Sequence, residues 1–192
     1  MGEDDRRERT RWTINGERLV DENRHVRLSV ADVTLPDGVR FEQYVMRLPR
    51  AALILLLNER AEVLMIWRHR FIIDRWVWEL PGGYVDQPGD DPLITAAREV
   101  EEETGWRARS LELLTTFQPL VGSVAQDNLI FIGRNGADHI GVPEDINEAE
   151  RIQWIPLDDV RPMMDSGDIV GAGSVIGLLR VLTERPEGQP AS

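Results

Sequence analysis

Four glutamates crowd into five consecutive positions, Glu99 and Glu101 to Glu103. On a helix, which turns about 100° per residue, Glu99 and Glu103 lie one turn apart on one edge, with Glu102 beside them. Glu101 points elsewhere. Carboxylates held this close repel one another, and a divalent cation relieves the repulsion. Hard oxygen ligands, with no cysteine or histidine nearby, favour Mg²⁺, with Mn²⁺ as an alternative.

The alternative for a glutamate-rich helix is an ordinary solvated acidic face. Here the carboxylates adjoin an apolar stripe on the same helix, so they belong partly to a buried wall. The stripe consists of Leu93, Ala96, Ala97 and Val100. The loop Pro81-Gly82-Gly83 also leads toward the helix, and glycines let backbone carbonyls approach a ligand closely. These two features favour a metal site over a solvated face.

The ends of this helix are marked by the residues that usually cap helices. Asp91 is a suitable N-cap, Pro92 fits the first helical position, and Gly105 fits the left-handed position after the last turn. The sequence therefore predicts a helix over residues 92–104.

The segment from Glu79 to Trp106 resembles the Nudix box. That pattern reads Gly, five residues, Glu, seven residues and then Arg-Glu-U-x-Glu-Glu-x-Gly-U, where U is a bulky apolar residue. Residues 98–106 fit the second half at every specified position. The first half departs twice, because Asp90 replaces the glutamate and one extra residue separates Gly83 from Asp90. An insertion in a loop costs little, so the resemblance is retained.

The resemblance implies metal-assisted attack of water on a diphosphate. The groups implied to hold metal are the carboxylates of Glu99 and Glu103 as main ligands, Glu102 in support, and the backbone carbonyl of Gly82. Two or three Mg²⁺ ions would bridge the diphosphate oxygens, neutralise developing charge and lower the pKa of a bound water. Arg98 would orient a carboxylate, and Asp90 would pair with Arg98 as a structural brace.

Beyond the box, the layout of about residues 12–184 is similar to that of the ADP-ribose pyrophosphatase branch of the family. In that branch an acidic residue in a later loop serves as the general base. Glu148 is the best positional match and Glu150 the second, with an exposed acidic loop as the alternative for each. The resemblance thus implies Glu148, Glu102 and Arg98 as the catalytic residues.

Arg70, Gly83 and Gly122 are predicted to bind substrate. Arg70 matches an arginine that contacts a substrate phosphate in the same branch, and a surface salt bridge is the alternative. The loop 117–122 keeps Gly122 but has Val121 where the branch usually has proline. ADP-ribose is therefore a leading candidate, and another sugar nucleotide remains open.

The rest of the chain positions these residues. The turn residues Leu35-Pro36-Asp37-Gly38 between two strand patterns, 26–33 and 41–48, predict an N-terminal antiparallel hairpin. Two further strands are predicted at 51–58 and 62–68, which would form a pair around the turn at 58–60. Other strands are predicted at 76–80, 111–117, 128–132 and 152–155. Helices are predicted at 157–165 and 174–183. The predicted fold class is α/β (α+β), a Nudix-type α/β/α sandwich whose mixed sheet lies between helices.

We divide the chain into a disordered tail (1–11), the hairpin region (12–48), a Nudix hydrolase domain (49–185) and a second disordered tail (186–192). By resemblance, the hairpin region is expected to exchange between the subunits of a homodimer. The net charge of −12 would repel a phosphate backbone, which argues against nucleic-acid binding. Without cysteine, an apolar run of membrane-spanning length or a secretory signal, the chain is expected to be cytoplasmic, with no membrane partner.

The predicted function is metal-dependent hydrolysis of a nucleoside diphosphate linked to X, giving AMP and a sugar phosphate if the substrate is ADP-ribose. One competing hypothesis is a non-catalytic regulatory module that binds nucleotide sugars on the same scaffold. Another is a structural protein whose acidic helix contacts a partner. The presence of Glu99, Glu102 and Glu103 favours the enzyme.

Overall fold

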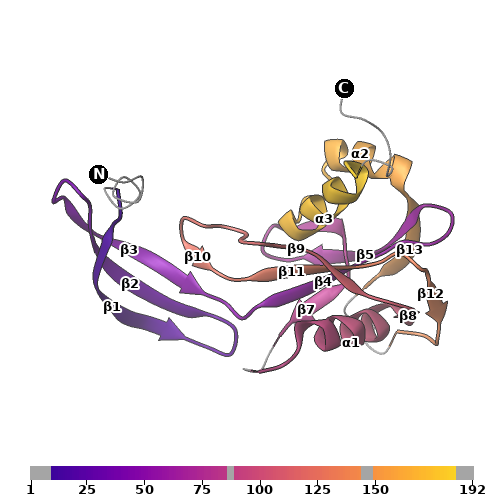
Figure 1. Ribbon diagram of the computed structural model, residues 1–192, viewed down its shortest axis with the longest axis horizontal. Helices are drawn as coiled ribbons and strands as arrows, with labels where there is room; N and C mark the ends of the chain where they lie inside the picture. The colour runs from indigo at the N-terminus through magenta and orange to yellow at the C-terminus, as the bar shows by residue number, and fades with distance from the viewer. Residues whose placement is uncertain (1–9, 86–88, 144–148, 185–192) are drawn as a thin grey trace, which may run out of the picture. The chain divides into compact units, whose positions relative to one another are not determined.

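The computed structural model describes residues 10–85, 89–143 and 149–184 (Figure 1). Most of the two predicted tails, and Glu148, lie outside these residues. The chain divides into two compact units. The smaller contains the chain up to Pro49 together with Gln118–Gln126, and the larger contains Arg50–Phe117 and the chain from Asp127 onward.

The smaller unit is built on one sheet. Its strands are, in sheet order, β1 (Thr13–Glu22), β2 (Arg27–Thr34), β3 (Arg40–Arg47) and β10 (Val124–Ala125). The first three pair antiparallel, and β10 runs parallel to β3. The predicted hairpin is β2 with β3, and Gly38 in its turn takes a φ of 89°. The sequence did not predict β1, because all its residues are exposed and no buried apolar alternation marks it.

The larger unit contains a mixed sheet and an antiparallel sheet. The mixed sheet has the order β7 (Gly82–Tyr84), β4 (Ala51–Leu56), β11 (Asn128–Gly133) and β9 (Glu112–Phe117), with β4 and β11 parallel. The antiparallel sheet has the order β13 (Arg151–Pro156), β5 (Glu62–Arg70) and β6 (Arg75–Glu79). The other elements are β8 (Trp106–Ala108) paired with β12 (Ala137–His139), and the helices α1 (Pro92–Thr104), α2 (Leu157–Ser166) and α3 (Ala172–Leu182).

The prediction that residues 51–58 and 62–68 form one strand pair is wrong. β4 pairs with β7 and β11, whereas β5 pairs with β6 and β13, so the two strands belong to different sheets. Only a turn at Asn58 and an isolated bridge between Leu57 and Val63 connect them directly. The turn residues favour a hairpin locally, but β4 is buried on both faces, and a doubly buried strand requires partners on both edges.

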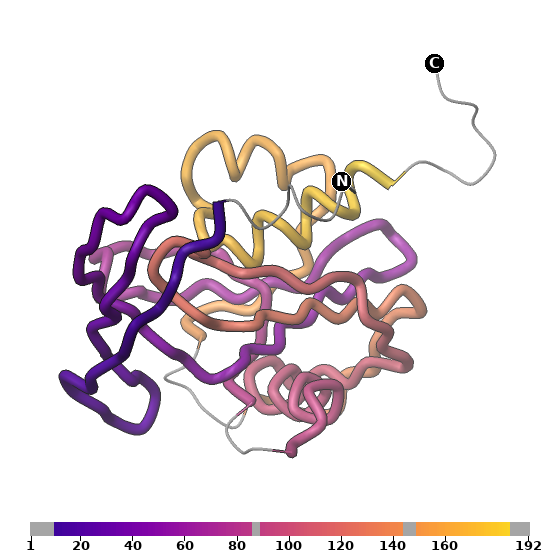
Figure 2. Tube along the Cα trace, turned by 60° about the vertical axis from the view of Figure 1, so that its left-hand side comes forward, coloured from indigo at the N-terminus to yellow at the C-terminus, as the bar shows by residue number. Residues whose placement is uncertain are grey.

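Apolar side chains alternate between the two faces of these sheets. One face packs against α2 and α3 in a cluster that includes Leu55, Met65, Ile130, Val160 and Leu178. The other packs against α1 in a cluster that includes Ile54, Leu64, Ala96, Val100 and Phe131. Figures 1 and 2 show α1 on one side of the sheets and the other two helices on the opposite side. The predicted α/β/α sandwich is therefore confirmed.

In the part of the chain that the structure describes, no helix has both the length and the apolar character needed to cross a membrane.

Candidate functional site

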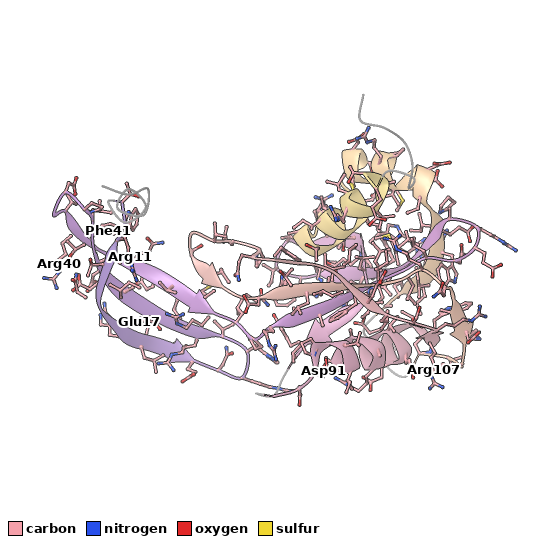
Figure 3. The ribbon with its side chains drawn as sticks, in the orientation of Figure 1. Arg11, Glu17, Arg40, Phe41, Asp91 and Arg107 are labelled. Carbon is pink, nitrogen blue, oxygen red and sulfur yellow. The ribbon has the colours of Figure 1, made fainter. Side chains whose placement is uncertain are left out.

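The caps predicted for α1 are confirmed. Asp91 precedes the helix, and its carboxylate accepts a hydrogen bond from the Leu93 N–H at 2.9 Å. Gly105 ends the helix with a φ of 70° and donates its N–H to the carbonyl of Glu101. A Cβ at position 105 would lie 2.2 Å from the Gly141 carbonyl oxygen, so glycine is required there twice over. Figure 3 shows Asp91 at the start of α1 and Arg107 beyond its end.

Glu103 lies in the interior, with 4% of its surface exposed. One carboxylate oxygen accepts the backbone N–H of Gly82 at 2.8 Å, and the other accepts an N–H of Arg68 at 3.3 Å. Burial raises the pKa of Glu103 to about 7, although Arg68 and the Gly82 N–H oppose the rise; the nearby Glu99 adds to it. The site thus contains a carboxylate that loses its proton near neutrality.

Glu99 reaches the same strand, β7, one residue further along. A Cβ at Gly83 would lie 2.5 Å from a carboxylate oxygen of Glu99, so only a glycine leaves room for that oxygen. Gly82 has a φ of 152°, and a Cβ there would lie 2.3 Å from the Ala52 carbonyl oxygen. We call Glu99 and Glu103 the inner edge of α1, because both meet the two glycines of β7.

The exposed side chain of Arg98 joins Glu99 of this edge to Glu102. Its guanidinium donates to Glu99 at 2.6 Å and to Glu102, one turn later, at 2.7 Å. The predicted orienting contact of Arg98 with a box carboxylate is therefore present. The predicted brace between Asp90 and Arg98 is wrong for the described residues, because Arg98 turns toward its own helix. The Asp90 carbonyl instead accepts a hydrogen bond from Arg50.

Glu101 and Glu102 form the outer edge of α1. Glu101 is paired with Arg107 at 2.8 Å, which lowers the pKa of the Glu101 carboxyl. This edge borders a pocket of about 270 Å³. The pocket is lined by Arg98, Glu101, Glu102, Gly105, Arg107, Ile140, Gly141 and Val142. Glu102 is therefore placed to act through solvent or a ligand, whereas the inner edge faces protein.

The other predicted site residues are placed as follows. Arg70, at the end of β5, forms an ion pair with Glu79 of β6 at 2.6 Å. Gly122 belongs to the smaller unit, where its carbonyl accepts a hydrogen bond from Gln43. Glu148 lies outside the described residues. The side chain of Glu150 is exposed, and its N–H donates to the Trp67 carbonyl.

Sequence reasoning missed Arg68 and Glu79. Arg68 lies on β5 with only 12% of its side chain exposed, and Glu79 has 13% exposed. The sequence does show that Arg68 follows directly on the apolar residues of its strand, and a charge in such a place needs a counter-charge nearby. The pattern alone does not identify that counter-charge as Glu103.

The inner edge fits a hard divalent cation. In the described ranges, no three side chains of His, Cys, Asp or Glu gather closely enough to hold a metal ion. A metal here would therefore take the carboxylates of Glu99 and Glu103, backbone oxygen from the glycine strand, and water or substrate oxygens. Mg²⁺ commonly binds in this way, through one or two carboxylates with several retained oxygens from water or phosphate. The close approach of Gly83 to Glu99 supports this fit, because any side chain would fill the space.

Comparisons with known proteins agree with this geometry. The NUDIX domain family matches residues 47–170. A CMP-5'-(N-acetyl-N-hydroxy-3-aminopropyl)phosphonate hydrolase from Streptomyces rubellomurinus is 47% identical over 90% of this chain and 82% of its own. An ADP-ribose pyrophosphatase from Bacillus subtilis is 27% identical over 76% of this chain and 78% of its own. The crystal structure of an ADP compounds hydrolase, 21% identical, superposes with a TM-score of 0.77 over 90% of this chain and 92% of that one, and this likeness shows the fold.

The chain belongs to the Nudix hydrolase family, and it is a diphosphate-cleaving enzyme. The predicted family, fold class and enzyme class are confirmed. Members of this family typically use a divalent metal.

Proposed function

We propose that this hydrolase cleaves the phosphoanhydride bond between a nucleoside monophosphate and a phosphonate or phosphate group, and that CMP-phosphonates are its first substrate class. The observation that carries the proposal is the buried carboxylate of Glu103 beside the glycine strand. The substrate class is supported by the CMP-phosphonate hydrolase, whose 47% identity extends over 90% of this chain. The products would be CMP and the free phosphonate.

The proposed cofactor is Mg²⁺, two or three ions per site, with Mn²⁺ as an alternative. Glu99, Glu103 and the Gly82 carbonyl would hold it, with Glu102 supporting them through the outer edge. When bound, the metal would neutralise charge on the diphosphate oxygens and make a bound water more acidic. The protein holds the metal-binding carboxylates in position. Arg98 fixes Glu99 and Glu102 together, and the Gly82 N–H holds one oxygen of Glu103.

Arg70 is proposed to bind a phosphate or phosphonate oxygen of the substrate. Its ion pair with Glu79 restrains the guanidinium, and about half of the Arg70 side chain is exposed and accessible to a ligand. Gly83 is proposed to contact substrate through its backbone, and Gly122 is retained as a proposed contact. Glu148 is proposed as the general base that takes the proton from the attacking water, with Glu150 as second choice.

ADP-ribose, or another sugar nucleotide, is the second candidate substrate. It is supported by the ADP-ribose pyrophosphatase relatives from Bacillus subtilis and Mycobacterium tuberculosis, both 27% identical to this chain. The lower identity and Val121, in place of the proline usual in that branch, rank it second. The expected products are AMP and a sugar phosphate.

A substrate panel tests the proposal. Purified protein with Mg²⁺ is incubated with a CMP-phosphonate anhydride, ADP-ribose, CDP- and UDP-sugars and a dinucleotide, and nucleoside monophosphate release is followed by chromatography. We expect the highest kcat/KM for the CMP-phosphonate. Hydrolysis in ¹⁸O-water with ³¹P NMR detection then shows which phosphorus the water attacks. Faster cleavage of ADP-ribose would favour the second candidate. If no substrate is cleaved with any divalent metal, the regulatory-module hypothesis returns.

We further propose that the enzyme is a homodimer in which the strands of the smaller unit contribute to the interface. Several large apolar side chains of that unit are exposed, including Trp12, Ile14, Leu19 and Tyr44. Light scattering at micromolar concentration checks the mass. A monomer would contradict this part of the proposal and leave the reaction untouched.

A further inference from the structure

Arg68 is a mostly buried arginine that lies beside the inner edge. It lies near the C-terminal end of β5, and only 12% of its side chain is exposed. Arg68 forms an ion pair with Glu103, with an N–O distance of 3.3 Å, and the exposed fraction of the Glu103 side chain is 6%. Taking two charges out of water is costly unless they compensate each other. Arg68 and Glu103 therefore form one electrostatic unit.

This pairing uses the carboxylate that the proposed metal also needs. Among the described residues, the charged groups that act on Arg68 include Glu79 on β6 and Arg70 on the same strand, and Glu99 acts on Glu103 from α1. A divalent cation at the inner edge would bring positive charge close to the Arg68 guanidinium. Like charges separated by several ångströms in a partly dry site weaken each other's binding.

We infer that Arg68 is the resident counter-ion of Glu103, a positioning residue that holds this carboxylate when metal is absent and lowers the affinity of the site for divalent metal. The inference rests on the proposed function only in taking the inner edge as the metal site. The consequence is that bound metal exchanges readily. Without Mg²⁺, Arg68 neutralises the Glu103 carboxylate, and when Mg²⁺ binds, the positive charge of Arg68 repels it.

The test is metal affinity in variants of Arg68. Mn²⁺ and Mg²⁺ binding to the whole chain are measured by titration calorimetry, without substrate, in the wild type and in Arg68→Gln and Arg68→Lys. Removing the charge in Arg68→Gln should tighten metal binding roughly tenfold. Arg68→Lys keeps the charge and should remain close to the wild type. Arg109→Gln is the matched control, because Arg109 pairs with Asp138 at 2.7 Å in an exposed position of the same unit.

Thermal unfolding gives an independent readout. The rise in melting temperature caused by saturating Mg²⁺ should be larger in Arg68→Gln than in the wild type, because tighter binding to the folded state stabilises it more. A variant that folds only with Mg²⁺ supports the inference, since the metal then replaces the missing counter-ion. Arg68→Met keeps the aliphatic packing and serves if the glutamine variant does not fold in either condition.

The outcomes separate this inference from the proposed function. If the wild type binds neither metal, the proposed metal site fails, and the inference fails with it. If the wild type binds metal and Arg68→Gln binds with equal or weaker affinity, the proposed metal site stands and the role given to Arg68 is overturned.

Discussion

The inner and outer edges of α1 contain the same residue type in very different surroundings. Glu103 has 6% of its side chain exposed and is held by a backbone N–H and a mostly buried arginine. Its immediate neighbour Glu102 has 38% exposed and is paired with an exposed arginine of its own helix. The difference arises from packing, because the inner edge meets β7 and β5 and the outer edge meets solvent. We expect chemistry to depend on the inner edge far more than on the outer one.

The largest expected effect is that of Glu103→Gln. The amide keeps the shape but removes the negative charge that would bind metal, so turnover should fall by roughly 10² to 10³-fold or more. The measurement is kcat with saturating Mg²⁺, with circular dichroism as a check on the fold. Glu101→Gln is the matched control on the same helix. Equal losses in the two variants would mean that the edges do not differ as described.

Replacing Gly83 should affect the metal site and spare the fold. In Gly83→Ala the new Cβ would displace the Glu99 carboxylate, which is the flexible end of a side chain, so melting temperature should change little. Metal affinity should weaken by roughly tenfold to a hundredfold, as measured by calorimetry.

Gly82→Ala provides the contrast, because its Cβ would meet the backbone of Ala52 at a φ of 152°. That variant should lose stability first. If Gly83→Ala retained full metal affinity, Glu99 would not be a ligand in the proposed position.

Metal-free stability should depend on pH through Glu103. Its pKa is raised from 4.5 to about 7 in the folded chain, so the folded chain binds a proton more tightly than the unfolded chain. The stabilisation is therefore fully present below pH 4.5 and is lost as pH rises through about 7, with a magnitude on the order of 3 kcal/mol. Differential scanning fluorimetry without metal should show this fall in the wild type, and Glu103→Gln should lack it. An identical pH profile in both proteins would exclude Glu103 as the titrating group.

The smallest expected effect is that of Glu102→Gln. Its pair with Arg98 is exposed, and exposed pairs contribute little to stability. Removing one supporting carboxylate should lower kcat less than about tenfold and leave the melting temperature unchanged. Steady-state kinetics compare it with Glu103→Gln in one buffer. A loss as large as that of Glu103→Gln would assign the outer edge a direct role in the reaction.

The sequence was sufficient for features that depend on residues close together in the chain. The α1 caps at Asp91 and Gly105 and the family pattern are local, and both are confirmed. Pairings between distant segments were beyond it, as the error at β4 and β5 shows. The apolar stripe predicted that the carboxylates lie partly in a buried wall, but it did not predict the partners of Glu103, because Arg68 and Gly82 belong to other elements. The roles of Glu148 and Gly122 remain predictions.

The smaller unit is assembled from two separate stretches of chain, because β10 pairs with β3 although Arg50–Phe117 of the larger unit lies between them in the sequence. A gene segment ending at Pro49 would not transfer this unit to another protein, since its fourth strand would stay behind. Conversely, an enzyme that lacks the chain up to Pro49 would keep β10 without its partner strand β3, and the backbone hydrogen-bonding groups of β10 would be left unpaired. To transfer the smaller unit, recombination or protein engineering must therefore cut the gene after Pro49 and also on both sides of Gln118–Gln126.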